Sequence, residues 1–133
     1  MSEQFNAEFC GSYIHLKHAL GLVINPQSAD KIWDQFAELG AQYKCGKFLV
    51  EAGEVKREMN TMQAFDSGVK MSAIKPRLTV ALCLLNYKQD ELSEFFATVA
   101  HNRGANVKFF DDIEAAKKWL GVDQAAKHSN DPA

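Results

Sequence analysis

The sequence lacks the features that are typical of membrane-spanning, disordered and collagen-like proteins. Its 133 residues include only three prolines, and its longest apolar run, Val80 to Leu85, is far shorter than the roughly 20 residues of a membrane-spanning helix. Apolar residues make up 47% and charged residues 24% of the chain, which excludes disordered, collagen-like and low-complexity proteins. We expect one folded domain over residues 1–122 and a polar, frayed tail over 123–133.

The chain also lacks a basic excess. Its 15 Lys and Arg residues stand against 17 Asp and Glu residues, so nucleic acid is not an expected partner. The first residues carry acids instead of the basic region of a secretory signal. The three cysteines, Cys10, Cys45 and Cys83, are odd in number and widely spaced, which favours reduced thiols. We therefore expect a cytoplasmic protein without disulfides.

Motifs of catalysis and metal binding are missing from the sequence. It has no glycine-rich phosphate loop, no nucleophile elbow and no close Cys/His ligand pair. The cysteines fall in three different segments and are expected to be buried as small apolar side chains. His101 lies near the end of a predicted helix, where a cationic imidazole favours the helix dipole. The sequence therefore predicts no catalytic residue, no cofactor and no metal.

What the sequence does contain is a regular alternation of strands and helices. A hairpin hinged at Gly11-Ser12 opens the chain, and two unpatterned apolar runs indicate strands covered on both faces. The longer of these runs is expected to be the central strand of the sheet. The predicted strands cover residues 4–10, 12–20, 48–50, 78–85 and 106–110.

Four helices are predicted from their capping residues. The first follows Asn25-Pro26 and ends at Gly40 or at Cys45-Gly46; the others cover about residues 60–73, 88–102 and 112–120. Three of them carry the spacing of a capping box, which begins at Asn60, Asn86 and Asp111, and Gly104 and Gly121 are expected to end the last two. This order requires right-handed crossovers and a largely parallel sheet with the hairpin at its edge, an α/β fold.

The C-terminal half resembles a known family. After Arg77 come a hydrophobic strand, a helix that ends in His101-Asn102-Arg103-Gly104, the strand Asn106 to Phe110 and a closing segment from Glu114 to Leu120. In this order they resemble the SpoIIAA-like family, whose fold is shared by STAS domains and CRAL-TRIO lipid carriers. The resemblance implies a single-domain fold with a mostly parallel five-stranded sheet and four helices.

STAS regulators of the anti-sigma-antagonist kind carry an Asp-Ser-Ser/Thr-Gly stretch where the helix after the third strand begins. Here Met59-Asn60-Thr61 occupies that place, and the hydroxyl of Thr61 alone matches. An Asp66-Ser67-Gly68 tripeptide lies about two turns inside the predicted helix, where a phosphate gains no helix N-terminus. This departure argues against a kinase-driven switch, and it leaves Asn60 and Thr61 as a candidate surface for a protein partner.

The apolar faces of the second and third helices carry the more specific signal for function. Methionine and phenylalanine stripes repack around varied apolar shapes, and the CRAL-TRIO resemblance implies a nonpolar ligand between these helices. Gly68 in the helix interior costs about 1 kcal/mol relative to alanine and is expected to favour local opening. The expected ligand-binding residues are Met59, Met62, Phe65, Val69, Leu92, Phe95, Phe96 and Val99.

Other readings of the chain stay open. Ordinary core packing also explains apolar stripes. Ligands of open parallel sheets bind outside the carboxyl ends of the strands, where Glu51, Asn86, Asp111 and Asp112 are expected to gather.

The leading hypothesis is a non-catalytic carrier or sensor of a nonpolar, lipid-like small molecule. The first alternative is a STAS-type protein-interaction regulator, and the second is an interfacially activated enzyme, although no nucleophile and base pair is visible. Peripheral membrane contact is expected to be weak, because Asp90, Glu91 and Glu94 put negative charge at the start of the third helix.

Overall fold

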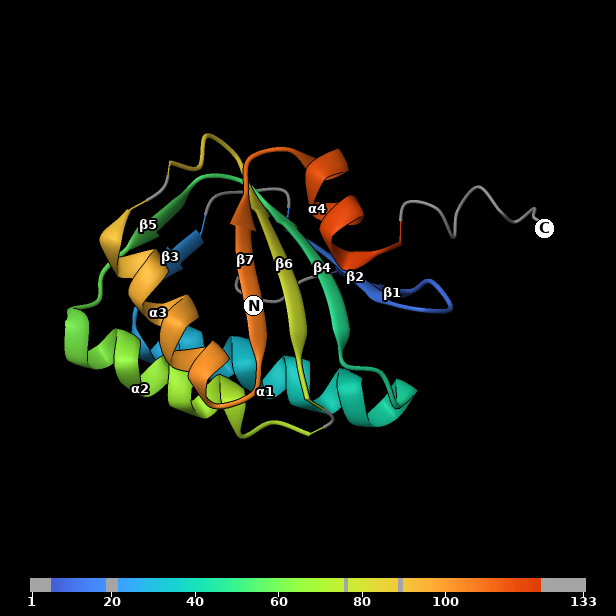
Figure 1. Cartoon of the computed structure of the whole chain (residues 1–133), viewed down its shortest axis with the longest axis horizontal. Coiled ribbons are helices and arrows are strands. Elements are labelled where there is room, and N and C mark those ends of the chain that lie inside the picture. Colours follow the sequence, from blue (N-terminus) through green and yellow to red (C-terminus); the bar gives the residue numbers. More distant parts are fainter. Residues whose placement is uncertain (1–5, 19–21, 76, 89, 123–133) are drawn as a thin grey trace.

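The computed structural model describes residues 6–18, 22–75, 77–88 and 90–122. The predicted tail, residues 123–133, lies outside the described residues. Over the described ranges the chain forms seven strands and four helices (Figure 1). In chain order they are β1 (Asn6–Phe9), β2 (Ile14–His18), β3 (Leu22–Ile24), α1 (Pro26–Tyr43), β4 (Lys47–Ala52), β5 (Val55–Arg57), α2 (Thr61–Ser72), β6 (Thr79–Leu84), α3 (Glu91–Asn102), β7 (Asn106–Phe110) and α4 (Ile113–Leu120).

Five of these strands form the main sheet in the order β1-β2-β4-β6-β7. The four strands from β2 to β7 are parallel to their neighbours, and β1 is antiparallel to β2 at one edge. The predicted α/β fold, the mostly parallel sheet and the N-terminal hairpin are confirmed. The middle strand is β4, so the prediction that residues 78–85 are central was wrong. A long apolar run indicates that both faces of a strand are covered by other elements. Both β4 and β6 are covered in this way, so the run does not give the position of a strand in the sheet.

A second, two-stranded sheet joins β3 and β5 in parallel. The sequence predicts neither strand. Each of these strands has three residues, too few to show a period of two. The small sheet lies beside α3, away from α4 (Figure 1).

The two faces of the main sheet are covered unequally. Helices α1, α2 and α3 lie on one face, and the eight-residue α4 lies on the other (Figure 1). Alternate residues of β4 serve the two faces: Phe48 and Val50 join the core beneath α1 to α3, and Leu49 joins the smaller core beneath α4. None of the helices in the described ranges is long and apolar enough to cross a membrane.

Capping explains where the helices begin. The side chains of Asn25 and Asn60 accept hydrogen bonds from the backbone N–H groups three residues on, at 2.9 and 2.8 Å. Both N-caps and the capping box at Asn60 are confirmed, and Asn25 also forms a capping box, with Ser28, that the sequence did not predict. Asn86 does not cap α3. Its backbone is left-handed, with φ 58°, and its side chain donates to Glu54. The cap of α3 is Asp90, whose carboxylate accepts from the Ser93 N–H at 2.7 Å.

The start of α4 was predicted one residue early. Asp112, and not Asp111, accepts hydrogen bonds from the first N–H groups of that helix. The predicted glycine stops are confirmed, because Gly104 and Gly121 have φ values of 101° and 75°, which side-chain-bearing residues rarely adopt. Helix α1 runs past Gly40 to Tyr43, and Lys44 is its left-handed C-cap.

The buried face of α2 is built mostly from small residues. Ala64, Ser67, Gly68 and Met71 are buried, and they follow the helical spacing of three and four residues. This face is offset from the predicted stripe of Met62, Phe65 and Val69. The stripe was predicted from large apolar residues, but the close approach of a neighbouring helix needs small ones at the contact.

At Gly68, α2 and α3 pack closely. A Cβ atom placed on Gly68 would lie 2.9 Å from Cγ1 of Val99 and 3.3 Å from the backbone oxygen of Phe96. That Gly68 favours opening of the two helices stays a prediction; in the structure its absent side chain lets the helices pack against each other.

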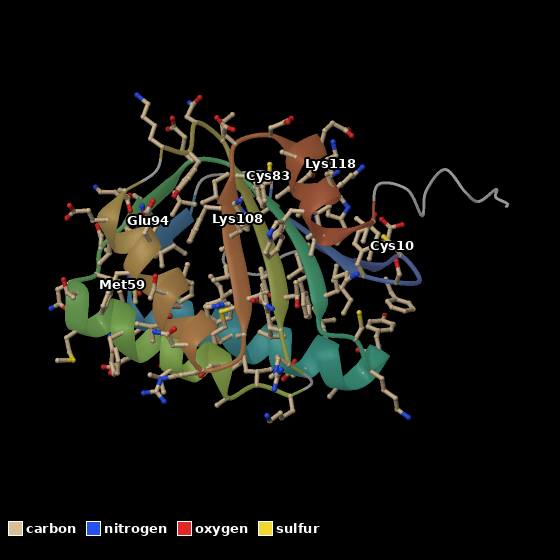
Figure 2. The ribbon with its side chains drawn as sticks, viewed as in Figure 1. Cys10, Met59, Cys83, Glu94, Lys108 and Lys118 are labelled. Carbon is tan, nitrogen blue, oxygen red and sulfur yellow. The ribbon has the colours of Figure 1, made fainter. Side chains whose placement is uncertain are left out.

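The cysteines are free, as predicted, but their burial was predicted incorrectly. Cys10 is exposed, and Cys45 and Cys83 are half-buried. Figure 2 shows Cys10 in the N-terminal hairpin and Cys83 well apart from it, near α4. This separation leaves the two thiols unable to form a disulfide with each other.

Substituting Gly68→Ala tests the contact between α2 and α3. Although alanine has the higher helix propensity, we expect the variant to lose about 1–3 kcal/mol of unfolding free energy, because its methyl group overpacks against Val99. Denaturant unfolding measures this loss. The control Asp66→Ala changes an exposed residue of the same helix and should be nearly neutral. Equal stability of Gly68→Ala and the parent chain would contradict the close contact.

Candidate functional site: an apolar cavity beneath three helices

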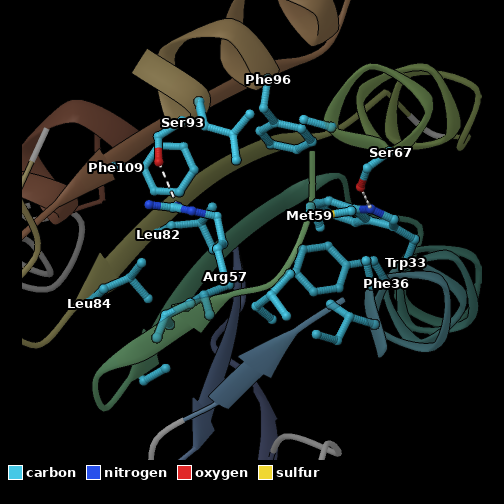
Figure 3. Close-up of a pocket in the computed structure, with 18 residues that line it drawn as sticks. Trp33, Phe36, Arg57, Met59, Ser67, Leu82, Leu84, Ser93, Phe96 and Phe109 are labelled. Atoms are coloured by element: carbon cyan, nitrogen blue, oxygen red, sulfur yellow. Dashed lines mark hydrogen bonds between the residues drawn. The ribbon is translucent and has the colours of Figure 1, made fainter. Parts of the chain in front are cut away.

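An apolar cavity of about 110 Å³ lies between the main sheet and helices α1, α2 and α3 (Figure 3). The small β3-β5 sheet closes one side of it. On the main sheet the cavity touches the carboxyl-terminal halves of β4 and β6, where ligands of open α/β sheets bind. Its lining consists of Ile24, Ala29, Ile32, Trp33, Phe36, Val50, Ala52, Val55, Arg57, Met59, Ala64, Ser67, Leu82, Leu84, Leu92, Ser93, Phe96 and Phe109.

A series of aromatic rings forms much of the wall. Phe36 stacks on Phe48 with ring centroids 4.6 Å apart, and it meets the edge of Trp33 at 5.1 Å. Trp33 in turn lies 5.9 Å from Phe96, and Phe96 meets Phe109 at 6.3 Å. Such pairs contribute about 0.5–1.5 kcal/mol each beyond the burial of their area. The wall is therefore held by contacts that cross from α1 to α3 and on to β7.

One buried hydrogen bond fixes this wall to α2. The indole Nε1–H of Trp33 donates to Oγ of Ser67 at 2.8 Å (Figure 3). Both residues are buried, at 6% and 9% exposure. The Asp66-Ser67-Gly68 tripeptide thus has a structural explanation: Ser67 accepts from Trp33, and Gly68 admits α3. A buried Ser67 hydroxyl that already holds an indole is not accessible to a kinase.

The structure separates the predicted ligand-binding residues into two groups. Met59, Leu92 and Phe96 line the cavity, and Figure 2 shows Met59 beside the first turn of α2. The others do not line it. Met62 and Phe95 are 66% and 37% exposed. Val69 is half-buried, Val99 packs at Gly68, and the half-buried Phe65 lies under the Arg103 guanidinium, 5.7 Å from its ring centre.

Three residues with distinctive chemistry line the cavity although the sequence did not predict them as part of a site: Trp33, Phe36 and Arg57. The signal for Trp33 was the presence of an indole, whose N–H requires a buried acceptor, on an otherwise apolar helix face.

The candidate protein-binding residues lie at the start of α2. Asn60 is the N-cap, so its side chain is occupied by the backbone of Gln63. Thr61 is the first residue of the helix and is exposed.

The cavity is lined at one end by Arg57 and Ser93, and Asp90 contacts Arg57 from outside it. Arg57 donates to Oγ of Ser93 at 2.6 Å and forms an ion pair with the carboxylate of Asp90. Burial raises the pKa of Asp90, but hydrogen bonds from Ser93 and the charge of Arg57 outweigh it, so the pKa lies below its usual value of 3.8. Asp90 is therefore ionised at neutral pH and holds the guanidinium at the rim of the cavity.

Most of the acidic residues expected at the carboxyl edge of the sheet lie near α4. Burial and then the charges of Glu51, Asp112 and Asp111 raise the pKa of Cys83, which makes this thiol a weak nucleophile at neutral pH. Glu51 lies 3.3 Å from Nε2 of His15. In the described ranges, no three His, Cys, Asp or Glu side chains are grouped so that they would hold a metal ion.

Comparisons with known proteins find a similarity among solved structures. No family model matches the chain, and no curated protein does. Among solved structures, an uncharacterised protein of the DUF3478 family from Shewanella loihica PV-4, with a SpoIIAA-like fold, is similar to it. The two share 22% identity over 87% of this chain and 91% of the other, with a TM-score of 0.46. That fold name is the one predicted from the segment Arg77 to Leu120.

Substituting Ser67→Ala tests the wall of the cavity. It leaves the Trp33 N–H buried without an acceptor, and we expect a loss of about 1–3 kcal/mol of unfolding free energy. In a Trp119→Phe background, the fluorescence of Trp33 reports the same change. Ser72→Ala is the matched control, because the Ser72 hydroxyl bonds only within its own helix, to Val69. A loss no larger than that of the control would refute the role of the hydrogen bond.

Substituting Asp90→Asn tests the ion pair through its dependence on pH. Asparagine caps α1 and α2 in this protein, so the cap is kept and the charge is removed. Because the folded-state pKa of Asp90 is lowered, its contribution is fully present above pH ~4 and is lost as the pH falls through the folded pKa. We expect the variant to be less stable at pH 7 by at most about 1 kcal/mol, as for exposed ion pairs, and the difference to vanish in acid. Urea unfolding at both pH values measures it, and a difference independent of pH would contradict it.

Proposed function

We propose that this protein is a non-catalytic carrier or sensor that binds a small nonpolar molecule in the cavity beneath α1, α2 and α3. The observation that carries the proposal is the cavity itself, whose lining is apolar apart from Arg57, Ser93 and Ser67, the last of which accepts a hydrogen bond from Trp33. An empty apolar cavity of about 110 Å³ costs on the order of 2–3 kcal/mol, by the dependence measured for core truncations. A ligand that fills the space recovers that free energy as binding.

The size of the cavity limits the ligand. A cavity of about 150 Å³ in another protein stays dry and binds benzene or xenon. The present cavity of about 110 Å³ is somewhat smaller, so it suits one ring or a short alkyl chain. A long acyl chain requires α2 and α3 to separate, against the close packing at Gly68 and Val99. The ligand class is therefore narrower than the lipid-like molecule expected from the sequence.

Toluene is a suitable probe of this function. A ligand that binds only the folded state stabilises it by RT ln(1 + [L]/Kd), which is about 1.4 kcal/mol at about ten times Kd. We expect toluene to raise the Tm of the parent chain by several degrees. Ala64→Leu fills the cavity from α2 and should abolish the shift.

Met62→Ala is the matched control, since it removes a large apolar side chain from the same helix, at an exposed position away from the cavity. It should keep the full toluene shift. An equal shift in the parent, Ala64→Leu and Met62→Ala chains would show that toluene acts elsewhere, and no shift in any of them would refute the proposal.

A STAS-type interaction with a protein partner is the second candidate. The observation in its favour is that Thr61 has an exposed position at the start of α2, next to Met62, which is 66% exposed. Its test is capture of a defined partner that Thr61→Glu releases and Thr61→Ser retains. Equal recovery by both variants would exclude Thr61 from such an interface.

A further inference from the structure

Arg57 lies between two hollows, the apolar cavity and a polar groove. It is the charged residue among the described residues that line the apolar cavity, and it also lines an open groove outside the carboxyl ends of β4 and β6. Val55 and Leu84 line both as well. The polar lining of the groove includes Glu54, Lys56, Asn86, Lys88 and Asp90. The apolar cavity therefore meets the polar groove at Arg57, whose guanidinium lies next to Ser93 in Figure 3.

This guanidinium already holds a carboxylate in the structure. One of its nitrogen atoms donates to Ser93, and another is paired with the carboxylate of Asp90. The planar guanidinium matches the geometry of carboxylates, for which it offers two parallel donors. The side chain of Arg57 is 23% exposed, and that of Asp90 is 43% exposed. Asp90 therefore faces water and can leave Arg57 at little cost, provided that another anion takes its place.

The charges of the groove favour an incoming anion. Three cations, Lys56, Arg57 and Lys88, line it against the two acids Glu54 and Asp90. A hydrocarbon that fills the cavity leaves this polar end unused. A molecule with both an apolar body and an anionic group meets both parts of the site, and the monoanionic, planar carboxylate suits a single guanidinium.

We propose that the cavity and the groove bind one molecule, a small amphiphilic carboxylate whose ring or short alkyl body fills the cavity and whose carboxylate replaces Asp90 at Arg57. This inference rests on the proposed function, because it names the ligand class of the same cavity. Arg57 then sets specificity, and Asp90 is the internal competitor that occupies Arg57 in the empty protein.

Three probes with similar apolar bodies test the inference: 3-phenylpropionate, its neutral amide, and toluene. Calorimetric or NMR titration at constant ionic strength gives the affinities. Charge-assisted hydrogen bonds to arginine predict that the acid binds at least about tenfold more tightly than the amide. Arg57→Gln should bring this ratio close to one.

Two further variants sharpen the result. Asp90→Asn removes the competitor and keeps the cap, so it should raise the affinity for the acid severalfold. Arg103→Gln is the matched control, since Arg103 is exposed and lines neither hollow. It should leave the ratio of acid to amide affinity unchanged.

The outcomes separate this inference from the proposed function. Equal binding of the acid and the amide, with toluene still bound, would overturn the carboxylate specificity and leave the cavity function standing. Failure of toluene and the acid to bind would overturn both. If Arg57→Gln does not fold, Asp90→Asn decides, because an unchanged affinity for the acid in that variant would also overturn the inference.

Discussion

The hydrogen bond from Trp33 to Ser67 is the contact on which the cavity depends. It joins α1 to α2 at 2.8 Å inside an apolar region, where an indole N–H without an acceptor is costly. The same indole lies against Phe36 of its own helix and Phe96 of α3. One side chain therefore sets how three helices are rotated relative to one another. Because those helices supply half of the residues that line the cavity, this contact helps to set the shape of the cavity.

The seam between α2 and α3, which is their contact at Gly68, is closely packed, whereas the cavity beside it is not filled by side chains. At Gly68 the two helices approach so closely that a methyl group does not fit. Next to this seam, the helices and the sheet leave a space that no side chain fills. Because the seam is closely packed, this space is present in the folded protein without any separation of the helices. Its lining is apolar apart from Arg57, Ser93 and Ser67.

Much of the fold follows from local signals in the sequence. The caps at Asn25 and Asn60 are satisfied by side chains three residues away, so neighbouring residues suffice to predict them. The site depends on packing between distant segments and was predicted only in part. Met59, Leu92 and Phe96 were found from their place on apolar stripes. The buried stripe of α2 was missed because it consists mostly of small residues, and Arg57 was missed because three-residue strands carry no periodic pattern.

The arginine at the rim of the cavity belongs to the smaller sheet, and this has a consequence for how the proposed ligand would enter. β3 and β5 pair over three residues each and have no further strand partner among the described residues. Two strands alone have marginal stability, so this sheet depends on its contacts with the helices and opens at a lower free energy than the five-stranded sheet. The side of the cavity that carries the guanidinium of Arg57 is therefore the side that opens at the lowest free energy. The rate at which a bound molecule exchanges with solvent would then be set by brief detachment of the six residues of β3 and β5, while the five-stranded sheet stays folded.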